Sequence, residues 1–339
     1  MKKEAISRVA VIGAGSWGTA LANLLAGKGV DVRLWVREEE VFQQIANERT
    51  NRVFLPGVAL DRRLQPVRSY EEALKERELV LMVVPSHVFR EVLTGLRPHL
   101  VEGMSLISAT KGIENESLLI MSQVAQSVLP DTFMADFASL DGPSFAKEVS
   151  RKLPTAVTIA SADVAHAQEL QRLFSTEFFR VYASQDVIGV QLGGALKNVI
   201  AIAAGAADGL EFGLNARAAL ITRGLAEITR LGVAMGASRD TFAGLAGMGD
   251  LVLTCTGDLS RNRTVGFKIG KGMSLAEITE SMNMVAEGIK TARSAYDLAN
   301  KKGVDMPITT QVYQILYNGK DPKEAVKALM GRELKCELD

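Results

Sequence analysis

The sequence predicts an α/β fold in which a doubly wound parallel sheet is followed by an all-helical domain. Its first half alternates short apolar or β-branched runs with helical patterns, which is typical of parallel strands joined by helices. A glycine-rich turn connects the first of these runs to a helical pattern. After about Asp186 the segments have helical patterns, and no run is convincing as a strand.

The expected strands all precede residue 185. Leu79 to Val84 is a continuous apolar run, as expected for a central parallel strand covered on both faces. Helices are expected from Ser16 to Gly27, from near Ser86, and from about Asp163 to Phe174. Together the strands are predicted at 8–12, 31–36, 79–84, 104–109, 155–160 and 178–182. We therefore expect a sheet domain over residues 1–185.

The second domain is expected over residues 186–339. Gly and Pro separate its helical patterns. The apolar stretch 187–207 is long enough to span a bilayer, but it is mostly Gly and Ala and contains Lys197, which is costly in lipid. We interpret it as a helix buried inside the protein. The helices are predicted at 187–209, 214–235, 240–246, 250–256, 262–270, 274–280, 287–302, 308–318 and 323–330.

Composition limits the classes of function. The 339 residues exceed what one hydrophobic core usually supports, about 250–300 residues. Formal net charge is zero, so no overall field favours nucleic acid or an acidic membrane. Two widely separated cysteines indicate a reducing compartment, which we take to be the cytoplasm. The three histidines have no ligand spacing, so we expect no metal site.

Residues 13–18 (GAGSWG) match the pattern G-x-G-x-x-G where a strand meets a helix, the context of a Rossmann dinucleotide site. In this reading Gly13 permits the tight turn, Gly15 leaves room for the pyrophosphate, and Gly18 lets the helix approach the strand. Helix amides would then face the phosphates. The alternative is a glycine-rich turn in some other α/β protein.

The end of the second expected strand bears on the choice between NAD and NADP. NAD-selective folds place Asp or Glu there to bind the ribose 2′-hydroxyl, whereas this chain has Arg37. Arginine suits a 2′-phosphate by charge and by its forked donors. Trp35 or Arg37 could also flank the adenine, and Glu38 keeps NAD(H) possible. We predict NADP(H) use with NAD(H) tolerated; the alternative is a solvated surface arginine.

Lys197 is the best candidate for a proton donor in carbonyl reduction, because no histidine or metal cluster is available. It lies in the most apolar helical pattern of the chain, where desolvation lowers a lysine pKa and an unpaired charge is costly. Asp250 begins a later helix and could pair with it, and Thr254 follows one turn later on the same face. The alternatives are a lysine that reaches the surface and an aspartate that only caps its helix.

Residues 260–264 (SRNRT) gather charge, forked donors and hydroxyl groups at an expected helix start. Such a start would hold a phosphate; the alternative is a charged helix end exposed to water. Two more polar turns, 110–112 (TKG) and 141–146 (DGPSFA), lie in the sheet domain. Strand ends in such sheets border the ligand crevice.

In this order the motifs resemble the NAD(P)-dependent glycerol-3-phosphate dehydrogenases, closest to the bacterial form, over nearly the whole chain. The resemblance implies a second domain like that of 6-phosphogluconate dehydrogenase. It also implies reversible reduction of dihydroxyacetone phosphate to sn-glycerol 3-phosphate, the backbone of glycerophospholipids, by a homodimer. The motifs that carry it are 13–20 (GAGSWGTA), 84–86 (VPS), 109–112 (ATKG), 142–146 (GPSFA), 195–198 (ALKN), 249–251 (GDL) and 260–262 (SRN).

The resemblance also implies roles for single residues. Lys197 would be the general acid/base, assisted by Asp250, and Arg261 and Asn262 would hold the substrate phosphate. Val285 and Glu287 match a segment that closes over the cofactor, although the residues alone make Glu287 a helix-start carboxylate. The remaining substrate contacts would be Lys111, Gly142, Ser144, Asn198, Thr254 and Ser260. The remaining cofactor contacts would be Ser16, Trp17, Arg37, Lys111, Ala146 and Arg261, besides the motif glycines.

Two rival functions stay open from the residues. One is a β-hydroxyacid dehydrogenase of the 6-phosphogluconate type, which shares the two-domain plan and a helix-borne lysine. It would need a carboxylate-binding group in place of a dedicated phosphate site. The other is a non-catalytic NADP-binding sensor, in which Lys197 and Asp250 would be dispensable.

Overall fold

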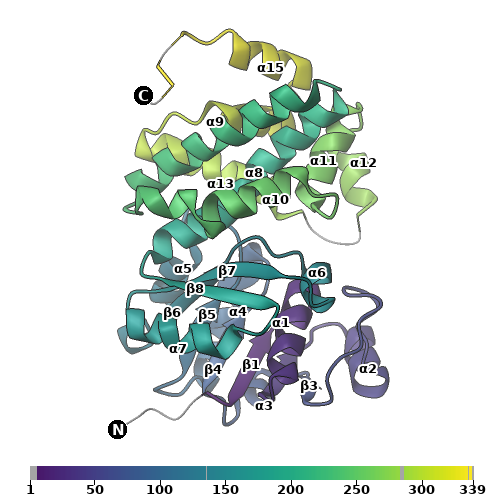
Figure 1. The fold of residues 1–339 in the computed structure, drawn as a ribbon, viewed down its shortest axis with the longest axis vertical. Helices are drawn as coiled ribbons and strands as arrows, with labels where there is room; N and C mark the ends of the chain where they lie inside the picture. The colour runs from purple at the N-terminus through teal and green to yellow at the C-terminus, as the bar shows by residue number, and fades with distance from the viewer. Residues whose placement is uncertain (1–5, 135, 283–285, 335, 338–339) are drawn as a thin grey trace.

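The computed structural model describes residues 6–134, 136–282, 286–334 and 336–337. One eight-stranded sheet occupies the lower half of Figure 1, and helices form the upper half. The strand order is β3-β2-β1-β4-β5-β6-β7-β8, so the chain reverses its direction of travel between β1 and β4. Such a switch point opens a crevice at the carboxyl ends of the strands. The strands are β1 Arg8–Ile12, β2 Asp31–Trp35, β3 Leu64–Val67, β4 Leu79–Met82, β5 Ser105–Ser108, β6 Phe137–Asp141, β7 Thr155–Ser161 and β8 Phe179–Ser184.

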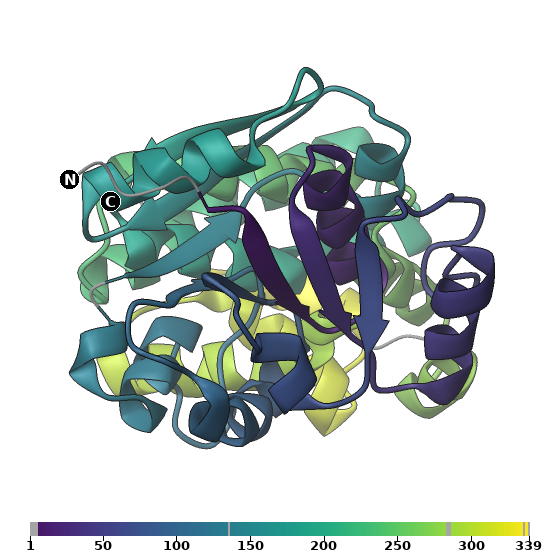
Figure 2. The same ribbon diagram turned by 90° about the horizontal axis from the view of Figure 1, so that it is seen from below.

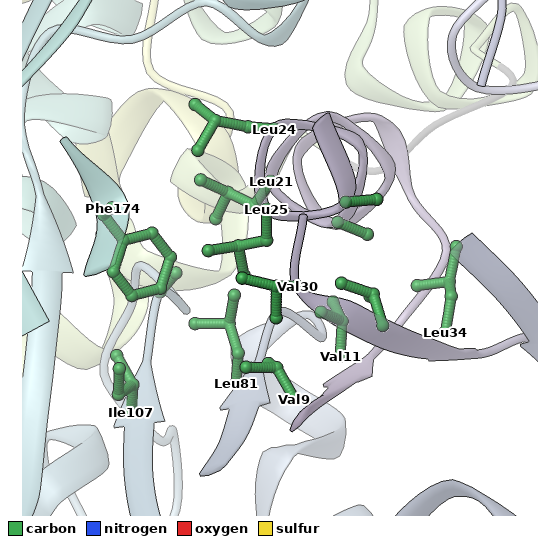
Figure 3. Packing of buried hydrophobic residues seen from close by; sticks show 14 of the residues in the cluster. Val9, Val11, Leu21, Leu24, Leu25, Val30, Leu34, Leu81, Ile107 and Phe174 are labelled. Carbon is green, nitrogen blue, oxygen red and sulfur yellow. The ribbon is translucent and has the colours of Figure 1, made fainter. Parts of the chain in front are cut away.

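The central strands β1, β4 and β5 are buried on both faces because helices cover both. On β1, Val9 and Val11 contribute to one hydrophobic cluster, and Ala10 and Ile12 contribute to another on the opposite face. Figure 3 shows the first cluster, in which Leu21 and Leu25 of one helix pack over Val9 and Val11. This arrangement explains why a central strand is a continuous apolar run and does not alternate with polar residues.

Two helical layers enclose the sheet, as the view from below shows (Figure 2). One layer, which belongs to the cluster in Figure 3, contains α1 Ser16–Gly27, α2 Glu39–Glu48, α6 Ala146–Ser150 and α7 Val164–Phe174. The other contains α3 Tyr70–Leu74, α4 Phe89–Leu96 and α5 Met121–Val128. The expected doubly wound sheet is therefore confirmed.

The helical half is built around α8, Val187–Gly209. This helix has the length and hydropathy of a membrane span, but 83% of the relevant window is buried inside the protein, as expected for a core helix. Gly205 of α8 lies against the backbone of α11, and Gly266 of α11 lies against the backbone of α8, so the two helices pack in close contact. The other helices are α9 Gly213–Ala234, α10 Asp250–Thr256, α11 Arg261–Gly270, α12 Leu275–Glu280, α13 Glu287–Lys302, α14 Pro307–Asn318 and α15 Pro322–Met330.

The structure corrects three expectations. The sheet is not wholly parallel, because β6 and β7 pair antiparallel. The helix expected at 240–246 is instead a 3₁₀ turn, Arg239–Ala243, followed by a π-helical turn, Leu245–Gly249. β3 and β6 were not expected as strands. No strand follows residue 186 in the described part of the chain, in agreement with the sequence.

One buried carboxylate ties two helices of the second domain together. Glu227 of α9 is 1% exposed and accepts hydrogen bonds from the backbone amides of Ile308 and Thr309, at 2.6 and 3.1 Å. These are orphan amides of the first turn of α14. Burial raises the pKa of Glu227 to about 7, with the amides of Ile308 and Thr309 opposing the rise.

We predict that Glu227→Ala lowers the free energy of unfolding by about 1–3 kcal/mol, because two buried amides lose their acceptor. The loss should be larger at pH 5 than at pH 8. A carboxylate whose pKa is raised from 4.5 to about 7 on folding stabilises the fold least above pH 7. Denaturant unfolding at both pH values measures this. Glu280→Ala, at an exposed site, is the control, and equal stability of the Glu227 variant and the wild type contradicts the prediction.

Candidate active site

A cleft of about 690 Å³ lies between the carboxyl edge of the sheet and the helical half. Loops after β1, β2, β4 and β5 line one wall, and the starts of α11 and α13, with the middle of α8, line the other. Of the expected site residues the lining includes Gly13, Gly15, Ser16, Trp17, Gly18, Arg37, Lys111, Ser144, Ala146, Lys197, Asn198, Thr254, Ser260, Arg261, Asn262 and Glu287. Gly142 and Asp250 lie just behind this surface, and Val285 lies outside the described residues.

The turn between β1 and α1 forms a cradle that side chains would fill. A Cβ on Gly13 would lie 2.6 Å from the carbonyl oxygen of Val83, and one on Gly18 would lie 1.9 Å from that of Gly13. A Cβ on Gly15 would meet nothing within 4 Å, so this glycine faces open space at the start of α1. The residues therefore fit a pyrophosphate placed against the first amides of the helix.

Arg37 stands at the mouth of the cleft, just after β2. Its side chain is 74% exposed, and its guanidinium nitrogens lie 2.8 and 3.0 Å from Oε1 of Glu38. Trp35 also lines the cleft; its ring packs against Tyr70 with centroids 4.9 Å apart. The arginine is thus solvated, as the alternative interpretation expected, although it lines the cleft.

Four charged groups meet at the cleft wall: Lys111 and Lys197 line it, and the buried Asp141 and Asp250 lie behind them. Lys197 of α8 is 6% exposed and forms an ion pair with Oδ2 of Asp250, the first residue of α10. The Nζ atom of Lys111, which follows β5, lies 2.7 Å from the same oxygen and 2.5 Å from Oδ1 of Asp141. Both alternative interpretations are wrong: Lys197 does not reach the surface, and Asp250 does more than cap its helix.

The environment separates the pKa values of the two amines. Burial lowers the pKa of Lys197 to about 8, although Asp250 opposes the shift. Burial also acts on Lys111, but Asp141 and Asp250 outweigh it and raise its pKa above the ordinary value. Burial raises the pKa of Asp141 to about 6, whereas the two lysines outweigh burial and lower the pKa of Asp250. Both carboxylates contact the Lys111 ammonium, which favours their ionised forms. Lys197 is therefore the amine able to exchange a proton near neutral pH.

Polar side chains that line the cleft near Lys197 make two separate sets of hydrogen bonds. Thr254 donates to the backbone oxygen of Asp250, one turn earlier, at 2.6 Å. Asn198 accepts from Nδ2 of Asn262 at 2.8 Å, and Oδ1 of Asn262 accepts from the amide of Gly288 at 3.0 Å. This chain of contacts fixes α8, α11 and α13 relative to one another.

The start of α11 has the form expected for an anion site. Ser260 caps the helix by accepting from the amide of Arg263, and Arg261, the first helical residue, is exposed to the cleft. Across the cleft Glu287 accepts from the amide of Ser86 at 3.2 Å and thereby links the two halves of the molecule. Burial raises the pKa of Glu287 to about 7, with Ser86, Arg261 and the two lysines opposing the rise.

The structure brings together residues that are far apart in sequence, and it adds one that the sequence reasoning missed. Asp141 was noted only as the first residue of a polar turn, yet it is 4% exposed and contacts Lys111. The sequence did not mark it, because β6, which Asp141 ends at the sheet's carboxyl edge, was not expected as a strand. In the described part of the chain no group of three or more His, Cys, Asp or Glu residues could hold a metal ion.

Comparison with known proteins gives one consistent match. Models of the N-terminal and C-terminal parts of NAD-dependent glycerol-3-phosphate dehydrogenase match residues 8–167 and 186–327. The glycerol-3-phosphate dehydrogenase [NAD(P)+] of Geobacter sulfurreducens is 58% identical over 97% of this chain and 98% of its own. The structure of the Coxiella burnetii glycerol-3-phosphate dehydrogenase superposes with a TM-score of 0.92 at 39% identity, over 96% of this chain and 99% of that one. The yeast enzyme GPD1 follows with a TM-score of 0.80 at 28% identity, over 96% and 99%.

We predict that Arg37→Ala raises the Kd for NADPH about tenfold and leaves the Kd for NADH within about twofold, since only NADPH offers a 2′-phosphate to a charged donor. Fluorescence titration with each dinucleotide measures both constants. Arg180→Ala, on the exposed face of β8, is the control. Equal weakening of NADPH and NADH would show that Arg37 does not read the 2′-position.

Proposed function

The chain belongs to the family of NAD-dependent glycerol-3-phosphate dehydrogenases, and we propose that Lys197 is the general acid/base of its reaction. The reaction is the reversible reduction of dihydroxyacetone phosphate to sn-glycerol 3-phosphate with NAD(P)H. One observation carries the proposal: Lys197, in a buried ion pair with Asp250, lines the same cleft as the glycine cradle and the start of α11.

The pair can move a proton at the reacting carbonyl. A dinucleotide held at the glycine cradle would supply the hydride for the carbonyl carbon. Lys197 gives a proton from Nζ to the carbonyl oxygen, and in the reverse direction it takes the proton from the hydroxyl group. Asp250 holds the amine and stabilises its charged form, and the hydroxyl of Thr254, one turn later, donates to Oδ1 of Asp250 at 3.4 Å.

We propose that the substrate phosphate binds at the start of α11. Arg261 would supply charge, the free amides of the helix would add donors, and Ser260 would fix the turn. Asn262 would contribute its remaining amide hydrogen, because its Oδ1 and one Nδ2 hydrogen already bind Gly288 and Asn198. The family match favours this substrate over the acids of the 6-phosphogluconate type.

The other proposed contacts follow from their places in the cleft. Lys111 would face both substrate and nicotinamide, and Asn198 would lie beside the reacting end. Gly142 and Ser144 would border the substrate; the backbone oxygen of Gly142 accepts from Ser144 at 2.9 Å and from Lys111 at 3.3 Å. The dinucleotide would contact Gly13, Gly15, Ser16, Trp17, Gly18, Arg37, Ala146, Arg261 and Glu287, which line the cleft. The resemblance to the family adds Val285, which lies outside the described residues.

We further propose the setting in which the enzyme works. Residues 1–185 would bind NADP(H), with NAD(H) tolerated, and residues 186–339 would bind the substrate. Both cysteines are free, Cys255 buried and Cys336 exposed, which suits a reducing cytoplasm. The product would supply glycerophospholipid synthesis. The active form would be a homodimer that acts on small molecules and not on nucleic acid.

We predict that Lys197→Ala lowers kcat for dihydroxyacetone phosphate about a hundredfold or more, the usual contribution of a general acid, and still binds NADPH. Steady-state oxidation of NADPH and fluorescence titration measure the two quantities. Lys271→Ala, a surface lysine paired with Glu211, is the control. A kcat near that of the wild type in the Lys197 variant rejects Lys197 as the general acid/base. If the wild-type protein binds NADPH but does not turn over substrate, the result supports a non-catalytic NADP-binding sensor.

A second prediction concerns the phosphate site. Arg261→Ala should chiefly raise the KM for dihydroxyacetone phosphate, because it removes a binding charge. Activity toward glyceraldehyde, which has no phosphate, should change much less. Equal losses with both substrates would exclude Arg261 as the phosphate anchor. In a separate assay, turnover of β-keto acids by the wild-type enzyme would favour the 6-phosphogluconate type.

A further inference from the structure

Lys111 is held between two carboxylates, although only one of them is assigned to the reaction. Its Nζ atom lies 2.7 Å from Oδ2 of Asp250 and 2.5 Å from Oδ1 of Asp141. Asp141 and Asp250 are 4% and 1% exposed. Water therefore screens these charges weakly, and the balance of charge within the cluster matters.

Asp250 alone does not balance the two lysines. The same oxygen, Oδ2, contacts both Lys111 and Lys197. Two ammonium groups against one carboxylate would leave an uncompensated positive charge in a buried site, which is unfavourable. With Asp141 present, two amines face two carboxylates, and the cluster is neutral when both amines are protonated.

The fold provides a specific place for this second carboxylate. Asp141 ends β6, and its Oδ1 accepts from the amide of Gly142 at 2.6 Å. On the other side lies Gly194 of α8, one turn before Lys197; a Cβ there would lie 1.5 Å from Oδ2 of Asp141. Only a glycine at 194 leaves room for the carboxylate.

We propose that Asp141 is a positioning residue of the reaction. It binds and neutralises Lys111, so that Asp250 can pair with Lys197, the acid/base. The inference rests on the proposed function of Lys197. Asp141 contacts neither the cleft nor the reacting atoms; it acts through Lys111. It makes the two neighbouring amines unequal, one permanently charged and one able to exchange its proton.

The direction of the effect follows from the groups that face Lys197. Asp250 from α10 and Asp141 from β6 favour its charged form, and Lys111 from the loop after β5 opposes it. Glu287 of α13 and Cys255 of α10 also interact with Lys197, and Arg261 of α11 interacts with Glu287. Removal of the charge on Asp141 leaves Lys111 facing Lys197 with one carboxylate between them. Lys197 then loses its proton at lower pH.

The test is the pH profile of kcat in both directions for Asp141→Asn, which keeps the shape and the acceptor for Gly142. Reduction needs protonated Lys197 and declines as pH rises through its pKa, whereas oxidation needs the neutral amine and increases. We expect both midpoints to move down by about one pH unit, the scale of a lost neighbouring charge. Reduction at pH 8 should then fall several-fold more than reduction at pH 6.5.

Charge-matched variants separate this role from a structural one. Lys111→Met removes the repelling cation and should move the midpoint up. The double variant Lys111→Met/Asp141→Asn again has one amine and one carboxylate, and its midpoint should return to within about half a unit of wild type. Asp186→Asn is the control, since Asp186 also lies against a glycine of α8, Gly189, but far from the cluster; it should change the Tm without moving the profile.

Fold and cofactor binding are checked by Tm and NADPH titration, and Asp141→Ser replaces Asp141→Asn if the latter does not fold. Unmoved midpoints in the Asp141 variant, with Lys197→Ala inactive, overturn this inference alone. If Asp141→Asn and the double variant Lys111→Met/Asp141→Asn shift the midpoint equally, the inference is also overturned, because the charge on Lys111 would then be irrelevant. Wild-type activity in Lys197→Ala overturns the proposed function and this inference with it.

Discussion

The ion pair of Lys197 and Asp250 is the interaction on which the rest of the site depends. A lysine in an apolar helix is tolerated only with a well-placed anion, and Asp250 is 53 residues away in sequence (250 − 197). To bring the two together, α10 must begin against the middle of α8. The glycine-containing π-helical turn before α10 makes this possible, because Gly193 of α8 lies directly against the backbone of Ala246 in that turn.

The sheet supplies the other half of the site through its topology. Parallel strands end at one edge, so the turns after β1, β4 and β5 meet there although they are far apart in sequence. β6 ends at the same edge and brings Asp141 to Lys111. Glu287 closes the arrangement from the helical half by binding the amide of Ser86. The cleft is therefore a product of both halves, and neither contains it alone.

The elements that the sequence missed share a physical cause. β3 carries Pro66 and lies at the edge of the sheet, the position where a strand tolerates proline. β6 includes Ser139 and Asp141, so it lacks the apolar run that identified β4. Its antiparallel pairing with β7 depends on a return of the chain through α6, and no local pattern encodes the direction of that return. Glu227 was not singled out either, because its partners are amides of α14, 81 residues on.

The sequence by itself determined the two-part architecture, the glycine cradle, the lysine in the apolar helix and the capped start of α11, because each of these is a local pattern whose chemistry shows in neighbouring residues. Only the tertiary structure decided which charges meet. In the structure Lys111 contacts both Asp141 and Asp250, and Lys197 contacts Asp250. Asp141 thereby becomes part of the cluster. Such pairings depend on distances across the sheet edge and between helices, and electrostatic energy in a buried site depends on those distances and on the exclusion of water.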